Sequence, residues 1–308
     1  MRGLQDVQGR LTVYTSRERH SSVDKAVRLA GYGIEQLRLI DVDPDFAMLP
    51  ERLAGAMAED IAAGFVPAAV VATTGTTGTT AIDPLRAIGE TCRRHGAWFH
   101  IDASYAGTAA ILPEKRWMLD GVELADSFVF NPHKWMLVNF DCSAYFVKDV
   151  DALLRTFSAS PEYLRTAHDA EVANFRDWGI QLGRRFRALK LWWVIKSYGV
   201  EGIQAIIRQH CDWAQQVAGW IAEDERFERM APVPLALVCF RLRPRAGEDL
   251  EAVNQRNREL LARVNATRQV YLSHTALDGR YTIRMAIGAR ATEFRHVQEA
   301  WALIAASA

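Results

Sequence analysis

The sequence is poor in cysteine, and the few cysteines that it has are far apart. Its 308 residues contain four, and no two form a CxxC pair: Cys92, Cys142, Cys211 and Cys239. Zinc sites and disulfide frameworks need cysteines in close pairs or in a dense, regular pattern, so neither is indicated. We therefore predict no metal site and a reducing compartment.

The sequence also lacks an excess of one charge and a long apolar run. Lys and Arg total 37 and Asp and Glu total 37, so the formal net charge is zero. Without a basic excess, there is no overall electrostatic attraction to nucleic acid or to an anionic membrane. No apolar run approaches the roughly 20 residues of a membrane helix, and segment 1–15 is too polar for a signal peptide. These absences predict a soluble, cytoplasmic protein that binds neither nucleic acid nor membrane.

The sequence does have a regular alternation of short β-rich runs with amphipathic helical segments. This rhythm predicts an α/β fold with a mainly parallel sheet covered by helices. The β-rich runs are 11–15, 37–42, 68–74, 98–103, 127–131 and 143–147. A long helical pattern follows over 180–225, and shorter α/β segments lead to the end of the chain. We predict a large cofactor-binding domain over 1–191 and a smaller C-terminal α/β domain over 192–308.

Polar residues whose side chains can take part in catalysis or ligand binding follow four of the β-rich runs. They are His20, Thr77, Asp102 and the pair His133 and Lys134. The carboxyl ends of parallel strands meet at one edge of a sheet, and ligands bind there in open α/β sheets. The sequence therefore predicts a single site at this edge. A helical segment over 23–30 begins close to His20, and the S-x-x-D pattern of Ser21 and Asp24 predicts its cap.

The lysine and the aspartate of this set suggest a particular chemistry. Lys134 lies in the run FNPHKWMLVNF, and partial burial of a lysine lowers the pKa of its amine so that it can form a Schiff base with an aldehyde. Asp102 ends an apolar run and precedes the small Ala103 and Ser104, which leaves room for a cationic ring nitrogen. Each residue alone also has an ordinary explanation, as a surface lysine or a structural hydrogen-bond acceptor. Together they fit a pyridoxal phosphate site.

Several strings resemble the group II pyridoxal-phosphate decarboxylases, specifically the aromatic-L-amino-acid decarboxylases that act on DOPA, tyrosine or tryptophan. The strings include VVATTGTTGTTAIDPL, WFHIDASYAG and FNPHKW, and the resemblance extends from about Leu11 to the last helix. It implies the fold type I of pyridoxal-phosphate-dependent transferases, with pyridoxal 5'-phosphate as cofactor. The implied activity is that of a carboxy-lyase, which converts an aromatic L-amino acid to its amine and CO2.

The resemblance also implies roles for the residues around the cofactor ring. Lys134 carries the cofactor covalently, Asp102 pairs with the pyridine nitrogen, His20 stacks on the ring and Thr77 contacts the cofactor. Ser104 stands where the animal enzymes usually have an alanine, and its hydroxyl can add a hydrogen bond near the ring.

Three further residues receive implied roles away from the ring. Asn131 and His133 help to hold the phosphate. Tyr163, in the string SPEYLRTAHD, matches the tyrosine of a mobile loop that closes over the substrate and gives a proton to its Cα, directly or through His20.

The sequence departs from the family in one large respect. In the family, a long N-terminal portion precedes the strand that here begins at Leu11. It supplies a dimerisation segment, much of the substrate pocket and a loop that binds the phosphate. The resemblance therefore implies an N-terminally truncated large domain, and a homodimer for a full-length protein. Two alternative functions stay open: an aromatic aldehyde synthase, in which the loop tyrosine is typically phenylalanine, and a catalytically silent fragment.

Overall fold

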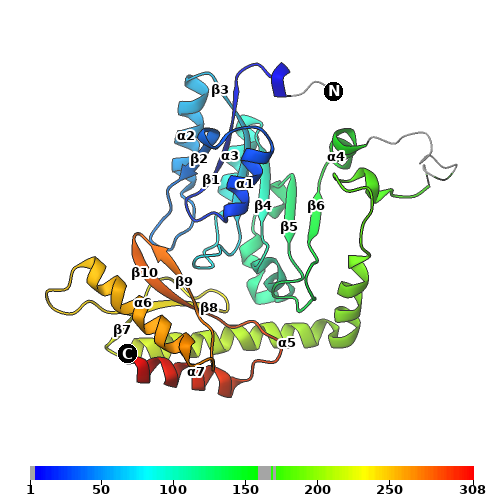
Figure 1. Cartoon of the computed structure of the whole chain (residues 1–308). Coiled ribbons are helices and arrows are strands. Elements are labelled where there is room, and N and C mark those ends of the chain that lie inside the picture. Colours follow the sequence, from blue (N-terminus) through cyan, green and yellow to red (C-terminus); the bar gives the residue numbers. More distant parts are fainter. Residues whose placement is uncertain (1–3, 159–167, 169–170) are drawn as a thin grey trace.

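Two β-sheets form the framework of the protein, for which a computed structural model describes residues 4–158, 168 and 171–308 (Figure 1). The larger sheet has the order β2-β1-β3-β4-β5-β6, and the smaller one has the order β7-β8-β10-β9. The strands of the larger sheet are β1 (Arg10–Ser16), β2 (Leu37–Ile40), β3 (Phe65–Thr73), β4 (Trp98–Asp102), β5 (Ser127–Phe130) and β6 (Ala144–Val147). Those of the smaller sheet are β7 (Phe227–Arg229), β8 (Leu237–Leu242), β9 (Ser273–Leu277) and β10 (Arg280–Ala286).

The larger sheet is parallel from β1 to β5, and β6 pairs with β5 in the antiparallel direction. Each predicted β-rich run corresponds to one of these strands, so the prediction of a mainly parallel sheet is confirmed. Parallel strands require crossover connections, and helices supply them here. The α-helices of this part are α1 (Ser21–Leu29), α2 (Pro50–Ala62), α3 (Leu85–His95) and α4 (Val150–Phe157).

The two faces of the larger sheet are covered differently. Leu53 and Met57 of α2 and Ile88 of α3 pack with Phe99 and Ile101 of β4 in a fully buried core on one face. On the other face, only α1 among these helices contributes to a buried cluster, and that cluster is small. It contains Val13, Val23, Val27 and Leu37, with Ala69 and Val71 packed against it. The α1 side of the sheet therefore has room for a site.

The smaller sheet is antiparallel and packs against long helices. These are α5 (Arg187–Glu223), α6 (Leu250–Ala266) and α7 (Phe294–Ser307). In Figure 1, α5 and α7 run beneath this sheet, and their apolar side chains share its core. Gly199 interrupts the helical backbone of α5 with φ of 66°. The boundary that we proposed between 191 and 192 falls inside the first turns of this helix.

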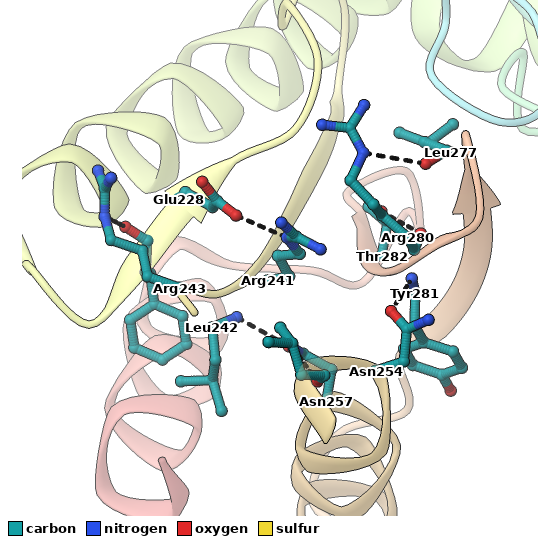
Figure 2. Close-up of polar contacts among 12 residues, drawn as sticks. Glu228, Arg241, Leu242, Arg243, Asn254, Asn257, Leu277, Arg280, Tyr281 and Thr282 are labelled. Atoms are coloured by element: carbon teal, nitrogen blue, oxygen red, sulfur yellow. Dashed lines mark hydrogen bonds and ion pairs between the residues drawn. The ribbon is translucent and has the colours of Figure 1, made fainter. Parts of the chain in front are cut away.

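Polar side chains fix α6 to the smaller sheet, as Figure 2 shows. Asn257 accepts a hydrogen bond from the Leu242 backbone at 2.8 Å, and Asn254 accepts one from the Tyr281 backbone at 2.7 Å. Both asparagines are buried, so these bonds satisfy groups that water cannot reach.

Short 3-10 helices occur in the connections. They are η1 (Leu4–Asp6), η2 (Ile34–Gln36), η3 (Ala106–Ile111), η4 (Pro113–Leu119), η5 (Val122–Leu124) and η7 (Phe175–Asp177). No helix within the described part of the chain is long and apolar enough to cross a membrane.

Candidate cofactor site

The carboxyl ends of β3, β4 and β5 are joined by backbone hydrogen bonds. The Thr74 N–H donates to the Asp102 carbonyl at 2.9 Å, and the Asn131 N–H donates to the Ser104 carbonyl at 3.0 Å. A tight turn then continues from Asn131, whose carbonyl accepts a bond from the Lys134 N–H at 2.9 Å. These bonds bring Asp102, Ser104, Asn131 and Lys134 to one edge of the sheet, as the spacing of the strands predicts.

Lys134 has a rigid neighbour on its carboxyl side. Trp135 is buried, its indole N–H donates to Nδ1 of His210 at 3.1 Å, and its ring stacks on that of Tyr105 with centroids 4.6 Å apart. The Lys134 side chain itself keeps solvent exposure. The protein atoms gathered around it nevertheless lower the pKa of its amine, and the nearby charge of Asp102 opposes this effect. The site thus presents an anchored lysine whose amine loses its proton more easily than a free lysine.

Asp102 keeps one carboxylate oxygen available. Its Oδ1 accepts hydrogen bonds from the backbone N–H of Ser104 at 2.9 Å and from the Ser104 hydroxyl. Within the described residues, Oδ2 accepts no hydrogen bond. The carboxylate is therefore held in place through one oxygen, and the other can pair with a cation.

A hollow of about 410 Å³ lies between α1 and the sheet, and Asp102, Ser104 and Asn131 contribute to its wall. Most of the remaining wall is apolar: Val13, Val23, Ala26, Val27, Ala30, Ala69, Val71 and Val129. The side-chain oxygen of Asn131 is buried and has no partner among the described residues. A buried amide oxygen without a hydrogen-bond partner destabilises the folded protein by roughly 1–3 kcal/mol. A ligand that supplies this partner removes the penalty and therefore binds more tightly.

His20 and Thr77 line a different hollow, of about 360 Å³, which also involves His274 and Arg284 of the smaller sheet. His20 is exposed and is the N-cap of α1, because its Nδ1 accepts a hydrogen bond from the Ser22 N–H at 3.2 Å. The predicted cap by Ser21 and Asp24 is therefore wrong. Asp24 is engaged instead by Arg19, at 2.7 Å and 2.9 Å.

His133 and Tyr163 are the two remaining residues of the predicted site. Nδ1 of His133 contacts the backbone of Cys142: it lies 2.6 Å from the carbonyl oxygen, to which a protonated Nδ1 donates, and 3.1 Å from the backbone nitrogen, from which an unprotonated Nδ1 accepts. Only its Nε2 is left for a phosphate. Tyr163 lies outside the described residues. In the described part of the chain, no cluster of three or more His, Cys, Asp or Glu side chains could hold a metal ion.

Comparison with known protein families identifies the family to which the chain belongs. The model of the pyridoxal-dependent decarboxylase conserved domain matches residues 2–243. The chain is a pyridoxal-dependent decarboxylase by family. The fold is thereby that of the pyridoxal-phosphate-dependent decarboxylases, and the family resemblance seen in the sequence is confirmed.

Individual relatives share most of this chain. A phenylacetaldehyde synthase of Arabidopsis thaliana is 46% identical over 96% of the chain and 61% of its own length. Tyrosine decarboxylase 2 of the same plant is 44% identical over 96% of the chain and 54% of its own length. The crystal structure of Oryza sativa TDC with PLP and tryptamine superimposes with a TM-score of 0.94 at 41% identity, over 97% of this chain and 62% of that one. The chain thus spans about three fifths of the length of these relatives.

The side chains at the sheet edge fit the pyridoxal phosphate of this decarboxylase family. A lysine amine with a lowered pKa suits an aldehyde, and the available oxygen of Asp102 suits a protonated ring nitrogen. Rotation of the Asn131 amide exchanges its oxygen for its NH2 group, which can donate to a phosphate oxygen. The donor set therefore matches the three chemically different parts of the cofactor.

Arg284 is a residue of the site region that sequence reasoning missed. From β10 it donates to the carbonyl oxygens of Thr77 and Gly78, and to the Ser273 hydroxyl at 2.9 Å. The smaller sheet thereby holds the loop that carries Thr77. The available signal was an arginine in the middle of the apolar strand YTIRMAIG.

Proposed function

We propose that this chain binds pyridoxal 5'-phosphate through Lys134 and belongs to an enzyme that decarboxylates an aromatic L-amino acid to its amine and CO2. The observation that carries the proposal is the Lys134 amine, whose pKa is lowered by the protein atoms gathered around it and which lies close enough to Asp102 for that charge to oppose the shift. The names of the relatives support the substrate class, because they include a tyrosine decarboxylase and a phenylacetaldehyde synthase.

Each residue of the edge would contribute a separate function. Lys134 holds the cofactor covalently, and its lowered pKa supplies the unprotonated amine that this bond requires. Asp102 pairs with the ring nitrogen through the oxygen that Ser104 leaves available. Asn131 and His133 hold the phosphate, and Thr77 contacts the cofactor from the second hollow. When bound, pyridoxal phosphate supplies an electron sink for the bond between Cα and the carboxylate.

Proton transfer completes the reaction. We assign the return of a proton to Cα to Tyr163, directly or through His20. The Nδ1 of His20 is occupied by the start of α1, so its Nε2 is the nitrogen that can take part.

A second candidate function is an aromatic aldehyde synthase, and the 46% identity to a phenylacetaldehyde synthase favours it. The tyrosine at position 163 favours plain decarboxylation. A third candidate is a catalytically silent fragment, which would act only by associating with a full-length partner. For a full-length enzyme we propose a homodimer, and a reducing cytoplasmic setting is supported by four cysteines that are all buried and free.

Cofactor binding by the chain tests the proposal. The chain is mixed with pyridoxal phosphate, and we expect a yellow protein in which borohydride fixes one cofactor to the peptide containing Lys134. Lys134→Ala should abolish both signals. Lys25→Ala, which removes an exposed lysine from α1, should change neither and serves as the control.

Products then distinguish the candidate functions. Tyrosine, DOPA and tryptophan are supplied, and amine, aldehyde and peroxide are measured. Amine as the main product supports the decarboxylase, and aldehyde with peroxide supports the aldehyde synthase. A colourless chain without borohydride fixation would overturn the assignment and leave the silent fragment.

A further inference from the structure

The turn that carries Lys134 has little backbone support on its carboxyl side. On its amino side, the Lys134 N–H donates to the Asn131 carbonyl at 2.9 Å. Among the described residues, no hydrogen bond is made by the backbone of Trp135. Leu137, two residues further on, has φ of 62°, a left-handed conformation that is costly for a residue with a side chain. The position of the chain just after Lys134 therefore depends on side-chain contacts.

The side chain of Trp135 makes these contacts, and its partners come from both parts of the protein. Its ring stacks on that of Tyr105, three residues beyond Asp102, with centroids 4.6 Å apart and planes 7° apart. Its indole N–H donates to Nδ1 of His210 on α5 at 3.1 Å. Trp135 and His210 are 1% and 2% exposed, so water cannot replace this bond. The ring is thus fixed between the segment that follows Asp102 and the helix that supports the smaller sheet.

The direction of the bond to His210 follows from the chemistry of the two rings. An indole N–H can only donate, so Nδ1 of His210 is the unprotonated nitrogen and the ring hydrogen is on Nε2. Burial, together with the positive charge of Arg290, lowers the pKa of His210 to about 4, so the ring is neutral at neutral pH. The imidazole also packs against Trp213 of the same helix, with ring centroids 5.8 Å apart, and Trp213 belongs to the core below the smaller sheet. His210 is therefore a fixed acceptor.

We propose that His210 is a positioning residue for Lys134, on which it acts from α5 by accepting the hydrogen bond of the adjacent Trp135. Because Tyr105 supports the face of the same indole, this bond fixes Lys134 relative to Asp102. The benefit to catalysis rests on the proposed function, since an amine that is already fixed needs less ordering when it binds the cofactor aldehyde. The effect on Lys134 itself can be tested without cofactor.

The first experiment measures the pKa of the Lys134 amine in the cofactor-free protein, by competitive labelling with acetic anhydride at several pH values and mass spectrometry of the peptides. His210→Leu removes the acceptor and should loosen the turn. The protein atoms around Lys134 lower its pKa, so a looser and better hydrated Lys134 should have a pKa closer to that of a free lysine. His210→Asn, whose side-chain oxygen can take the place of Nδ1, should keep the parent value. Lys25, exposed on α1, is the internal reference.

A control variant separates positioning from general destabilisation. Asn257→Ala removes a buried hydrogen bond between α6 and β8, so it should lower the free energy of unfolding, measured in urea, without changing the pKa of Lys134. An unchanged Lys134 pKa in His210→Leu, or an equal change in Asn257→Ala, would overturn the proposal. If His210→Leu does not fold, Trp135→Phe takes its place, because it keeps an aromatic ring and lacks the N–H, and it must raise the pKa of Lys134 in the same way.

15N NMR of the cofactor-free parent tests the hydrogen bond directly. His210→Asn removes the imidazole and so assigns its signals, and Trp135→Phe assigns the indole N–H. We expect the ring hydrogen of His210 on Nε2 throughout the neutral range, and an indole N–H that exchanges slowly with solvent. A ring hydrogen on Nδ1 would exclude the bond and refute the proposal.

The last experiment measures the affinity for pyridoxal phosphate. His210→Leu should weaken binding about tenfold, the scale of one unsatisfied buried N–H, and His210→Asn should recover most of the affinity. In the Trp135→Phe protein, His210→Leu should have no further effect, because the bond is already absent. Losses that simply add would show that His210 acts by another route, and the positioning role would be wrong. If the parent binds no cofactor while the Lys134 pKa responds as expected, the proposed function fails and the positioning of Lys134 stands.

Discussion

Replacement of the buried carboxylate Asp83 should destabilise the fold by an amount that its hydrogen bonds to the backbone determine. Asp83 is 2% exposed, and its two oxygens accept hydrogen bonds from the backbone N–H groups of Met48 and Thr73, each at 2.7 Å. Thr73 is the register partner of Asp102. Asp83→Asn keeps the shape but turns an NH2 group toward one of these N–H donors. The loss of one such bond in a buried site should lower the free energy of unfolding by about 1–3 kcal/mol.

The difference in the free energy of unfolding between the parent and Asp83→Asn should also depend on pH. Burial raises the pKa of Asp83 from 3.8 to about 6, against the opposing effect of the two backbone bonds. The folded protein therefore holds a proton that the unfolded chain has already released. Asp83 contributes stability below about pH 4, and this contribution is lost as the pH rises through about 6. The shift corresponds to about 3 kcal/mol at most. Asparagine does not titrate, so the difference between parent and variant should shrink over this range.

Urea unfolding, followed by tryptophan fluorescence and circular dichroism, measures this difference at several values between about pH 4 and about pH 8. Taking the difference between the two proteins removes the titration of all other groups, which they share. A difference that grows as the pH rises would mean that the two backbone bonds outweigh burial, and the reasoning would fail. Asp151→Asn, at an exposed position, should show no such trend.

Three further predictions concern the site. Arg284→Met should weaken pyridoxal phosphate binding about tenfold, because the loop of Thr77 and Gly78 loses its donors, whereas Arg280→Met on the same strand should not; equal affinities would show that the loop holds its position unaided. Asp102→Asn should reduce decarboxylation by several orders of magnitude in an active form of the enzyme even where cofactor binds, and a near-normal rate would make Asp102 structural. Tyr163→Phe should shift the product from amine toward aldehyde, because without its proton donor the substrate carbanion is oxidised by dissolved O2, which becomes peroxide, and water then releases ammonia; chromatography and a peroxidase assay measure the products, and unchanged amine output would remove Tyr163 as proton donor.

The sequence was sufficient to predict the edge of the sheet and its central pair. Parallel strands that alternate with helices have their carboxyl ends on one side, so Asp102 and Lys134 had to lie near each other. The order of strands was beyond reach, because it depends on which hydrophobic faces pack together across the whole domain. Arg284 illustrates the same limit, since its partners Thr77 and Gly78 are two hundred residues away in the chain.

Competition between neighbouring groups explains the local differences. The pattern of Ser21 and Asp24 is typical of a helix cap, but Arg19 binds Asp24 through two nitrogens, and His20 takes the capping position. A bidentate charged pair is stronger than a neutral capping bond, so Asp24 pairs with Arg19 and the S-x-x-D pattern does not form the cap. Ser104 was expected near the cofactor ring, and its hydroxyl lies against Asp102. Its effect on the cofactor would then pass through the orientation of that carboxylate.

The start of α1 connects the two hollows of the site. Ser22 lines the hollow of Asp102, whereas His20 and Ser21 line the hollow of Thr77. In the proposed function, a cofactor that is bound to Lys134 and contacts both Asp102 and Thr77 would pass the first turn of this helix. His20 fixes that turn through Nδ1, which is a different atom from the Nε2 that we propose for proton transfer. The imidazole would then have two functions, one for each nitrogen, and the capping bond would hold the ring in place for the second.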